Sequence, residues 1–169
     1  WNNASATEAA PAPLLLCLSL PDFPVAVLRR LVPALAGQPL VLGDGVIVAA
    51  SAEARALGVR PGQELALARA AHPTLHCLPA WPAIIQAHAE AVWAVARDFL
   101  PRLVLHEDYL LAEVPVCHYT HGSPQGLAEA LRAAIREQTG WSAVLGLAPN
   151  RFLARLTATR AGTSGWRCW

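Results

Sequence analysis

The sequence predicts an α+β protein: a ferredoxin-like βαββαβ sheet with a small lobe inserted after its first strand. Two observations support this prediction. When residues 25–78 are set aside, the remaining segments follow the order strand, helix, two strand segments, helix, strand, which places two helices on one face of an antiparallel sheet. Residues 25–78 contain only short elements, too small to build a large core of their own, and therefore form a compact insertion.

The composition limits the classes of protein that are possible. A chain of 169 residues with 54% hydrophobic and 15% charged residues can bury a core and is not disordered. No apolar run approaches the roughly 20 residues of a membrane span. With 13 basic and 12 acidic residues the net charge is only +1, so nucleic-acid binding would depend on locally placed arginines.

The cysteines and the N-terminus indicate a reducing compartment. The four cysteines stand singly, with no C-x-x-C pair and no histidines at zinc-ligand spacing, which favours free thiols in the cytoplasm. Residues 1–13 lack the features of a signal peptide and are expected to be a disordered segment.

The chain opens with a strand and a helix. The apolar run Leu14–Leu20, closed by Pro21, predicts a buried strand at the centre of a sheet. Apolar residues at helical spacing then predict a helix over residues 22–36, with Gly37 just beyond its end.

The inserted lobe is predicted to form a hairpin followed by short segments. Gly43-Asp44-Gly45 joins two β-type runs, which predicts a hairpin. Ser51 can cap a short helix that ends at Gly58, because its hydroxyl can accept from free backbone amides. The other predicted elements of the lobe are a helix over residues 63–71 and a strand or extended connector over 74–80.

The remaining segments are longer. The polar triplet His106-Glu107-Asp108 divides a strand region, and Ser123, Pro124 and Gly140 bound an amphipathic helix at its two ends. The predicted elements are a helix over Trp81–Leu100, strands within Leu103–Val114, a helix over Ser123–Thr139, a strand over Trp141–Leu147 and a helix from Asn150.

Three segments in order resemble the Y-family DNA polymerases of the DinB and UmuC type. The segment ASAEARALGVRPGQELALARAAHPTLHCLPA is similar to the fingers pattern A-x-x-x-E-A-R-x-x-G-V-x-x-G with its following L-P. LHEDYLLAEVP is similar to S-I-D-E-A-Y-L-D, and AVLGLAPNRFLARLTA to S-x-G-I-A-x-N-K-x-L-A-K. The resemblance spans residues 14–167. It implies a palm over residues 14–24 and 79–169, a fingers-like lobe over 25–78, and no thumb or little-finger domain in this chain.

The resemblance also implies that the metal site of the family is degenerate. In the family, three carboxylates hold two Mg²⁺ ions for nucleotidyl transfer. Here Cys17 takes the first-strand position, and His106 and Glu107 take the adjacent pair, so only Glu107 keeps its carboxylate. No metal or other cofactor is therefore expected. The set of Cys17, His106 and Glu107 could suit zinc, or could simply be residues left in a relaxed core.

The resemblance implies that this chain keeps some, but not all, of the family's residues that contact phosphate. Arg55 stands where the family's fingers arginine contacts the triphosphate, and Arg151 replaces the family lysine, whereas Ala52 replaces a phosphate-contacting tyrosine. Arg155 and Arg160 lie on the same predicted helix as Arg151 and are possible DNA contacts, or else an ordinary charged face.

The leading hypothesis is a non-enzymatic relative, most similar to the ImuB branch. Such a protein would act as an adaptor in bacterial translesion synthesis and induced (SOS) mutagenesis. It would bind DNA weakly, and regions outside this chain would contact a replicative-type polymerase and the sliding clamp. One alternative is an active translesion polymerase that uses Mg²⁺ with Glu107, Asp108 and Asp22. Another is a ferredoxin-like domain that binds a small molecule.

Overall fold

A computed structural model describes residues 13–106, 108–114, 122–161 and 166–168. The predicted disordered segment, residues 1–13, lies outside the described residues except for Pro13. The chain divides into two compact units: unit 1 comprises Trp1–Ser19 and Val95–Trp169, and unit 2 comprises Leu20–Ala94. Each unit combines a sheet with helices, which confirms the predicted α+β class.

Unit 1 is built on a five-stranded sheet in the order β5-β6-β1-β7-β8. The central strand β1 pairs antiparallel with both β6 and β7, and β5 pairs antiparallel with β6. These four strands have the ferredoxin-like order that the sequence predicts. The strands are β1 (Leu14–Ser19), β5 (Leu103–Leu105), β6 (Tyr109–Val114), β7 (Val144–Ala148) and β8 (Trp166–Cys168).

The fifth strand was not predicted. Strand β8 pairs parallel with β7 and extends the sheet by one edge strand. Its three residues are too few to show a period of two, so the sequence pattern does not distinguish them from a loop.

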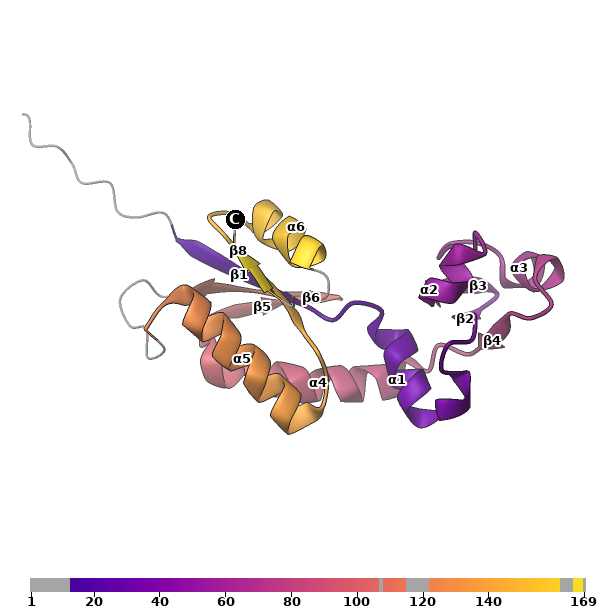
Figure 1. Ribbon diagram of the computed structural model, residues 1–169, viewed down its shortest axis with the longest axis horizontal. Coiled ribbons are helices and arrows are strands. Elements are labelled where there is room, and N and C mark those ends of the chain that lie inside the picture. The colour runs from indigo at the N-terminus through magenta and orange to yellow at the C-terminus, as the bar shows by residue number, and fades with distance from the viewer. Residues whose placement is uncertain (1–12, 107, 115–121, 162–165, 169) are drawn as a thin grey trace, which may run out of the picture. The chain divides into compact units, whose positions relative to one another are not determined.

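Helices lie on both faces of this sheet. Figure 1 shows α5 (Pro124–Thr139) on one side and α6 (Arg151–Ala161) on the other. Side chains of β1 alternate between the faces, so the fully buried Leu16 and Leu18 point away from α6. Cys17 points the other way and packs with Ala148, Ala154 and Ala158 under α6.

Helix α6 is held very close to β7 at Gly146. A Cβ atom added to Gly146 would lie 2.2 Å from the carbonyl oxygen of Ala154 and 2.3 Å from the backbone nitrogen of Ala158. The helix backbone therefore rests directly on the strand, which fixes the position of the arginines that α6 carries.

Helices α5 and α6 begin at side-chain caps, of which the sequence indicates the one at Ser123. The hydroxyl of Ser123 accepts from the N–H of Gly126 at 3.0 Å, and Gly140 ends α5 in the left-handed conformation with φ 71°. At the start of α6, Oδ1 of Asn150 accepts from the N–H of Leu153 at 2.9 Å.

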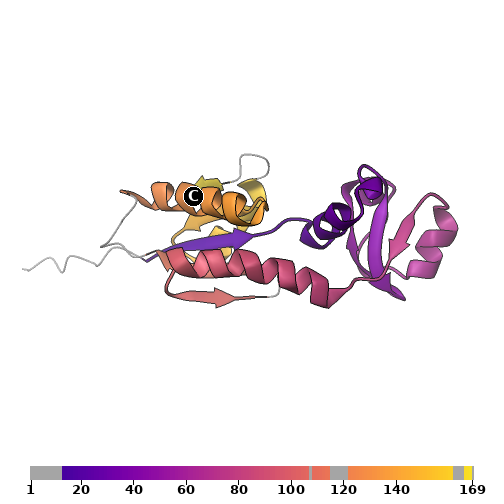
Figure 2. The ribbon, with the colours of Figure 1, turned by 90° about the horizontal axis from the view of Figure 1, so that it is seen from below.

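Unit 2 contains a three-stranded sheet in the order β3-β2-β4. The predicted hairpin joins β2 and β3 through Gly45, whose φ is 80°, and β4 adds to β2 in parallel. Figure 2 shows this sheet with its helices from a second direction. The elements are α1 (Phe23–Leu31), β2 (Leu40–Asp44), β3 (Val46–Ala50), α2 (Ala52–Ala56), α3 (Leu65–Ala71) and β4 (His76–Leu78); α4 (Pro82–Phe99) follows.

The first helix is shorter than predicted. Proline disfavours helical geometry in the residue before it, and Val32, which precedes Pro33, has φ −128° and ψ 83°. The prediction of one helix over residues 22–36 was therefore wrong beyond Leu31. The chain instead makes a separate 3₁₀ turn over Pro33–Leu35.

The capping role predicted for Ser51 is confirmed. Ser51 is 1% exposed, and its hydroxyl accepts from the N–H of Ala54 at 3.2 Å, at the start of α2. It also accepts from the N–H of Leu40 at 3.1 Å, so one side chain ties the helix to β2. Among the helices described, none is both long and apolar enough to cross a membrane.

Candidate functional site

Cys17 lies at the centre of β1, between Leu111 on β6 and Gly146 on β7. It is fully buried, and burial raises the pKa of its thiol to about 12, against a smaller opposing effect of the Arg155 charge. The thiol is therefore protonated at neutral pH. Sulfur is also a soft ligand, whereas Mg²⁺ requires hard oxygen ligands, so Cys17 cannot replace an aspartate as a magnesium ligand.

A cluster of four side chains lies at the connection between β5 and β6, next to α6. Its members are His106, Asp108, Tyr109 and Arg155. The guanidinium carbon of Arg155 lies 4.5 Å from the ring centre of Tyr109, and its Nη2 lies 3.4 Å from Oδ2 of Asp108. The ring of His106 stacks on Tyr109 at 4.3 Å and 16°. An arginine of α6 thus supplies the positive charge that faces the carboxylate of Asp108.

These residues do not fit a pair of magnesium ions. Mg²⁺ requires hard oxygen ligands, whereas the predicted positions offer a protonated thiol at Cys17 and a stacked imidazole at His106. Glu107, the third predicted residue, lies outside the described residues. Among the residues that the structure does describe, no three histidine, cysteine, aspartate or glutamate side chains are grouped to hold a metal ion.

In unit 2, the predicted phosphate-binding residue Arg55 is bound by Asp22. Nη1 and Nη2 of Arg55 each donate to one carboxylate oxygen of Asp22 at 2.7 Å, and Nη1 also donates to the carbonyl of Ala50. This hydrogen bonding raises the pKa of Arg55. Asp22, a metal ligand in the alternative hypothesis, is therefore bound to Arg55. Nothing in the sequence indicates that these two residues form a pair.

A neighbouring ion pair predicts a pH dependence of stability. Nη2 of Arg29 donates to Oε2 of Glu53 at 2.6 Å, and this bond lowers the pKa of Glu53 from 4.5 to about 2. The folded pKa lies below the unfolded one, so the pair stabilises the protein above pH 4.5 and this contribution is lost as the pH falls towards 2. We expect Glu53→Gln to lower the free energy of unfolding at pH 7 by less than about 1 kcal/mol, because the pair is partly exposed.

The measurement is urea unfolding at a series of pH values. The difference between wild type and Glu53→Gln should shrink as the pH drops from 4.5 to 2. Glu129→Gln, at an exposed glutamate of α5, is the matched control and should show no such trend. Parallel pH curves for wild type and Glu53→Gln would show that the pair does not contribute.

Arg151 and His106, both predicted site residues, line one hollow in unit 1. The hollow has a volume of about 390 Å³, and its other lining residues include Arg102, Val104 and Glu113. Sequence reasoning missed Arg102, because a lone arginine before a short strand carries no pattern. Arg160, in the last turn of α6, is exposed.

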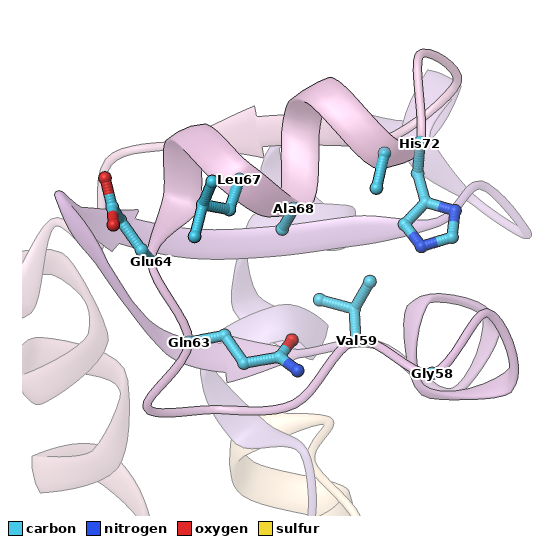
Figure 3. Close-up of a pocket in the computed structure, with 8 residues that line it drawn as sticks. Gly58, Val59, Gln63, Glu64, Leu67, Ala68 and His72 are labelled. Carbon is cyan, nitrogen blue, oxygen red and sulfur yellow. The ribbon is translucent and has the colours of Figure 1, made fainter.

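Unit 2 has a separate and largely apolar hollow of about 280 Å³. Figure 3 shows Leu67 and Ala68 of α3 above Val59 and Gln63, with His72 at one end. None of the predicted site residues lines it. The residues that could act on a charged ligand therefore gather in unit 1 and at the Arg55–Asp22 pair.

Comparison with known proteins identifies what this chain resembles. The family model described as impB/mucB/samB matches residues 18–159. DNA polymerase IV 2 of Mesorhizobium japonicum is 33% identical over 154 residues, which cover 89% of this chain and 37% of that protein. DNA polymerase IV of Halorhodospira halophila is 33% identical over 159 residues, 89% of this chain and 44% of that protein. The chain thus spans less than half the length of these relatives.

Solved structures agree on the fold. A Dbh ternary complex matches with a TM-score of 0.80 and 24% identity, over 92% of this chain and 47% of that one. DinB from Sulfolobus solfataricus matches with a TM-score of 0.79 and 23% identity, over 92% and 48%. These matches confirm the predicted fold class.

Proposed function

The chain belongs to the impB/mucB/samB family of Y-family DNA polymerases, and on this premise we propose that it is a catalytically degenerate member. It acts as an adaptor in bacterial DNA damage tolerance, similar to the ImuB branch, within translesion synthesis and the SOS response. Its compartment is the cytoplasm. In this role the polymerase fold is kept as a scaffold, and nucleotidyl transfer is left to another protein.

One observation carries the proposal: the buried thiol of Cys17, the residue that the resemblance aligns with the first metal-binding carboxylate of the family, is protonated. Cys17 is fully buried and the pKa of its thiol is about 12. Asp108, the carboxylate that directly follows Glu107, faces the guanidinium of Arg155. Neither a thiol at Cys17 nor an imidazole at His106 supplies the hard anionic oxygen that Mg²⁺ requires.

The domain assignment follows from the same resemblance. We assign residues 14–24 and 79–169 to a palm and residues 25–78 to a fingers-like lobe. DNA is the partner of this scaffold, with Arg155 and Arg160 as candidate contacts. Binding is weak because the net charge is only +1. Contacts with a replicative-type polymerase and with the sliding clamp belong to regions outside this chain.

Primer extension with the protein at its full natural length tests the proposal against the active-polymerase alternative. With Mg²⁺ or Mn²⁺ we expect no nucleotide addition above that of a Glu107→Ala variant. Glu129→Ala, which changes a glutamate on α5, is the matched control. Robust addition that Glu107→Ala abolishes and Glu129→Ala leaves intact would overturn the adaptor function.

A further inference from the structure

The connection that follows β1 contains a residue in an unusual backbone conformation. Asp22 precedes α1 and has the left-handed φ of 52° and ψ of 24°. An aspartate at this position usually accepts a hydrogen bond from the first free N–H groups of the helix. The carboxylate of Asp22 makes no such bond at α1, and its two oxygens bind Arg55 of α2 instead. The aspartate therefore serves the ion pair and not the helix cap.

The geometry of this pair closes Arg55 to other anions. Nη1 and Nη2 of Arg55 each donate to one oxygen of Asp22 at 2.7 Å, and Nη1 also donates to the carbonyl of Ala50 at 2.7 Å. A phosphate group would need the same two nitrogens, because it binds a guanidinium through the same fork as a carboxylate does. A phosphate group and the Asp22 carboxylate therefore cannot both bind Arg55 in this way.

Competition, and not burial, keeps anions from Arg55. The side chains of Arg55 and Asp22 are 36% and 49% exposed, so an anion in solution can reach them. The Asp22 carboxylate belongs to the same chain and competes at an effective concentration of about millimolar or more. The carbonyl of Ala50 and the cap at Ser51 hold the guanidinium and α2 independently of Asp22. Arg55 would therefore stay in place if the carboxylate were removed.

We propose that Asp22 is an autoinhibitory residue, whose carboxylate takes the place of a phosphate group at Arg55 and keeps nucleoside triphosphates from binding unit 2. The inference rests on the proposed function and deepens it. It explains how a scaffold without nucleotidyl transfer can retain Arg55 and yet stay free of nucleotide. It also gives Asp22 a role that differs from the alternative hypothesis, in which this carboxylate would hold Mg²⁺.

The test is isothermal titration calorimetry of the 169-residue chain with thymidine triphosphate in EDTA. We expect Asp22→Asn to bind the triphosphate about tenfold more tightly than wild type, because Arg55 no longer faces a competing charge. Asparagine, like aspartate, tolerates the left-handed conformation, so the backbone at residue 22 is preserved. A gain in affinity also cannot result from misfolding.

Three comparisons assign the gain to Arg55. Asp44→Asn removes an equal charge from an exposed position at the end of β2 and should change the affinity by less than about twofold. Combining Asp22→Asn with Arg55→Ala should abolish the gain, because no guanidinium is left at residue 55. Arg55→Ala alone should leave the affinity of wild type unchanged, because Asp22 already occupies this arginine.

Three results would overturn the inference. The first is an Asp22→Asn variant that binds no more tightly than Asp44→Asn, undetectable binding included. The second is a gain that persists in the double variant. The third is a wild type whose affinity falls about tenfold on Arg55→Ala, since Arg55 would then already be open. These results are independent of primer extension. Nucleotide addition would remove the adaptor function and leave a measured gain for Asp22→Asn standing, whereas absence of the gain would leave the adaptor function standing.

Discussion

Replacing Gly146 by alanine should lower the free energy of unfolding of unit 1 by about 3 kcal/mol, at the upper end of the usual cost of overpacking. The added methyl group would meet the backbone of α6 at Ala154 and Ala158, at 2.2 and 2.3 Å. A helix backbone cannot move aside as the end of a flexible side chain can. The helix must therefore shift away from β7, and Arg155 must shift with it. Urea unfolding of wild type and variant measures the loss.

Gly37→Ala is the control for the loss of a glycine. Gly37 has φ 71° but nothing within 4 Å of an added Cβ, so its replacement should cost only the conformational strain, about 1 kcal/mol. If Gly146→Ala cost no more than Gly37→Ala, the close packing of α6 on β7 would be contradicted.

Replacing Cys17 by aspartate, the residue type that the resemblance implies for this position in the family, should destabilise the protein by about 3 kcal/mol at neutral pH, because it buries a charge. Burial is already the largest influence on the Cys17 thiol, and the attraction of Arg155 offsets it only in part. Burial should therefore raise the pKa of the new carboxyl above its unfolded value near 4. A group with a raised folded pKa loses its stabilising contribution as the pH rises, so the deficit should grow from pH 4 upwards.

Cys17→Asn is the matched neutral control. It has nearly the same shape as the aspartate variant, and its deficit should not change with pH. Urea unfolding between pH 4 and 8, with and without Mg²⁺, measures both variants. If Mg²⁺ selectively restored the stability of Cys17→Asp, the remaining residues would form a working metal site, contrary to our account.

Much of the fold follows from local patterns in the sequence. The apolar run of β1 predicts a central strand, the caps at Ser51 and Ser123 mark the starts of two helices, and a third helix is predicted from Asn150. These features depend on neighbouring residues only. The break before Pro33 also has a local cause, although the helical spacing of the apolar residues outweighed it in the prediction.

The chemistry of the site was less accessible from the sequence. The resemblance singled out Cys17, Arg55 and Arg151, but it did not show that Asp22 binds Arg55 or that Arg102 joins Arg151. Such pairs form between residues far apart in the chain and depend on tertiary packing. Arg155 was predicted as a DNA contact. Its role there remains a prediction, while its contacts with Asp108 and Tyr109 emerged only from the structure.

The central place of β1 has a consequence for how the protein is made. This strand leaves the ribosome before the strands it pairs with, because its partners β6 and β7 are translated only after all of unit 2. Unit 2 pairs its own strands over shorter stretches of chain and can fold while synthesis continues. The apolar Leu14–Ser19 segment therefore stays without strand partners during this part of synthesis. Because an exposed apolar segment can aggregate, nascent chains stalled before β7 should depend most on chaperones.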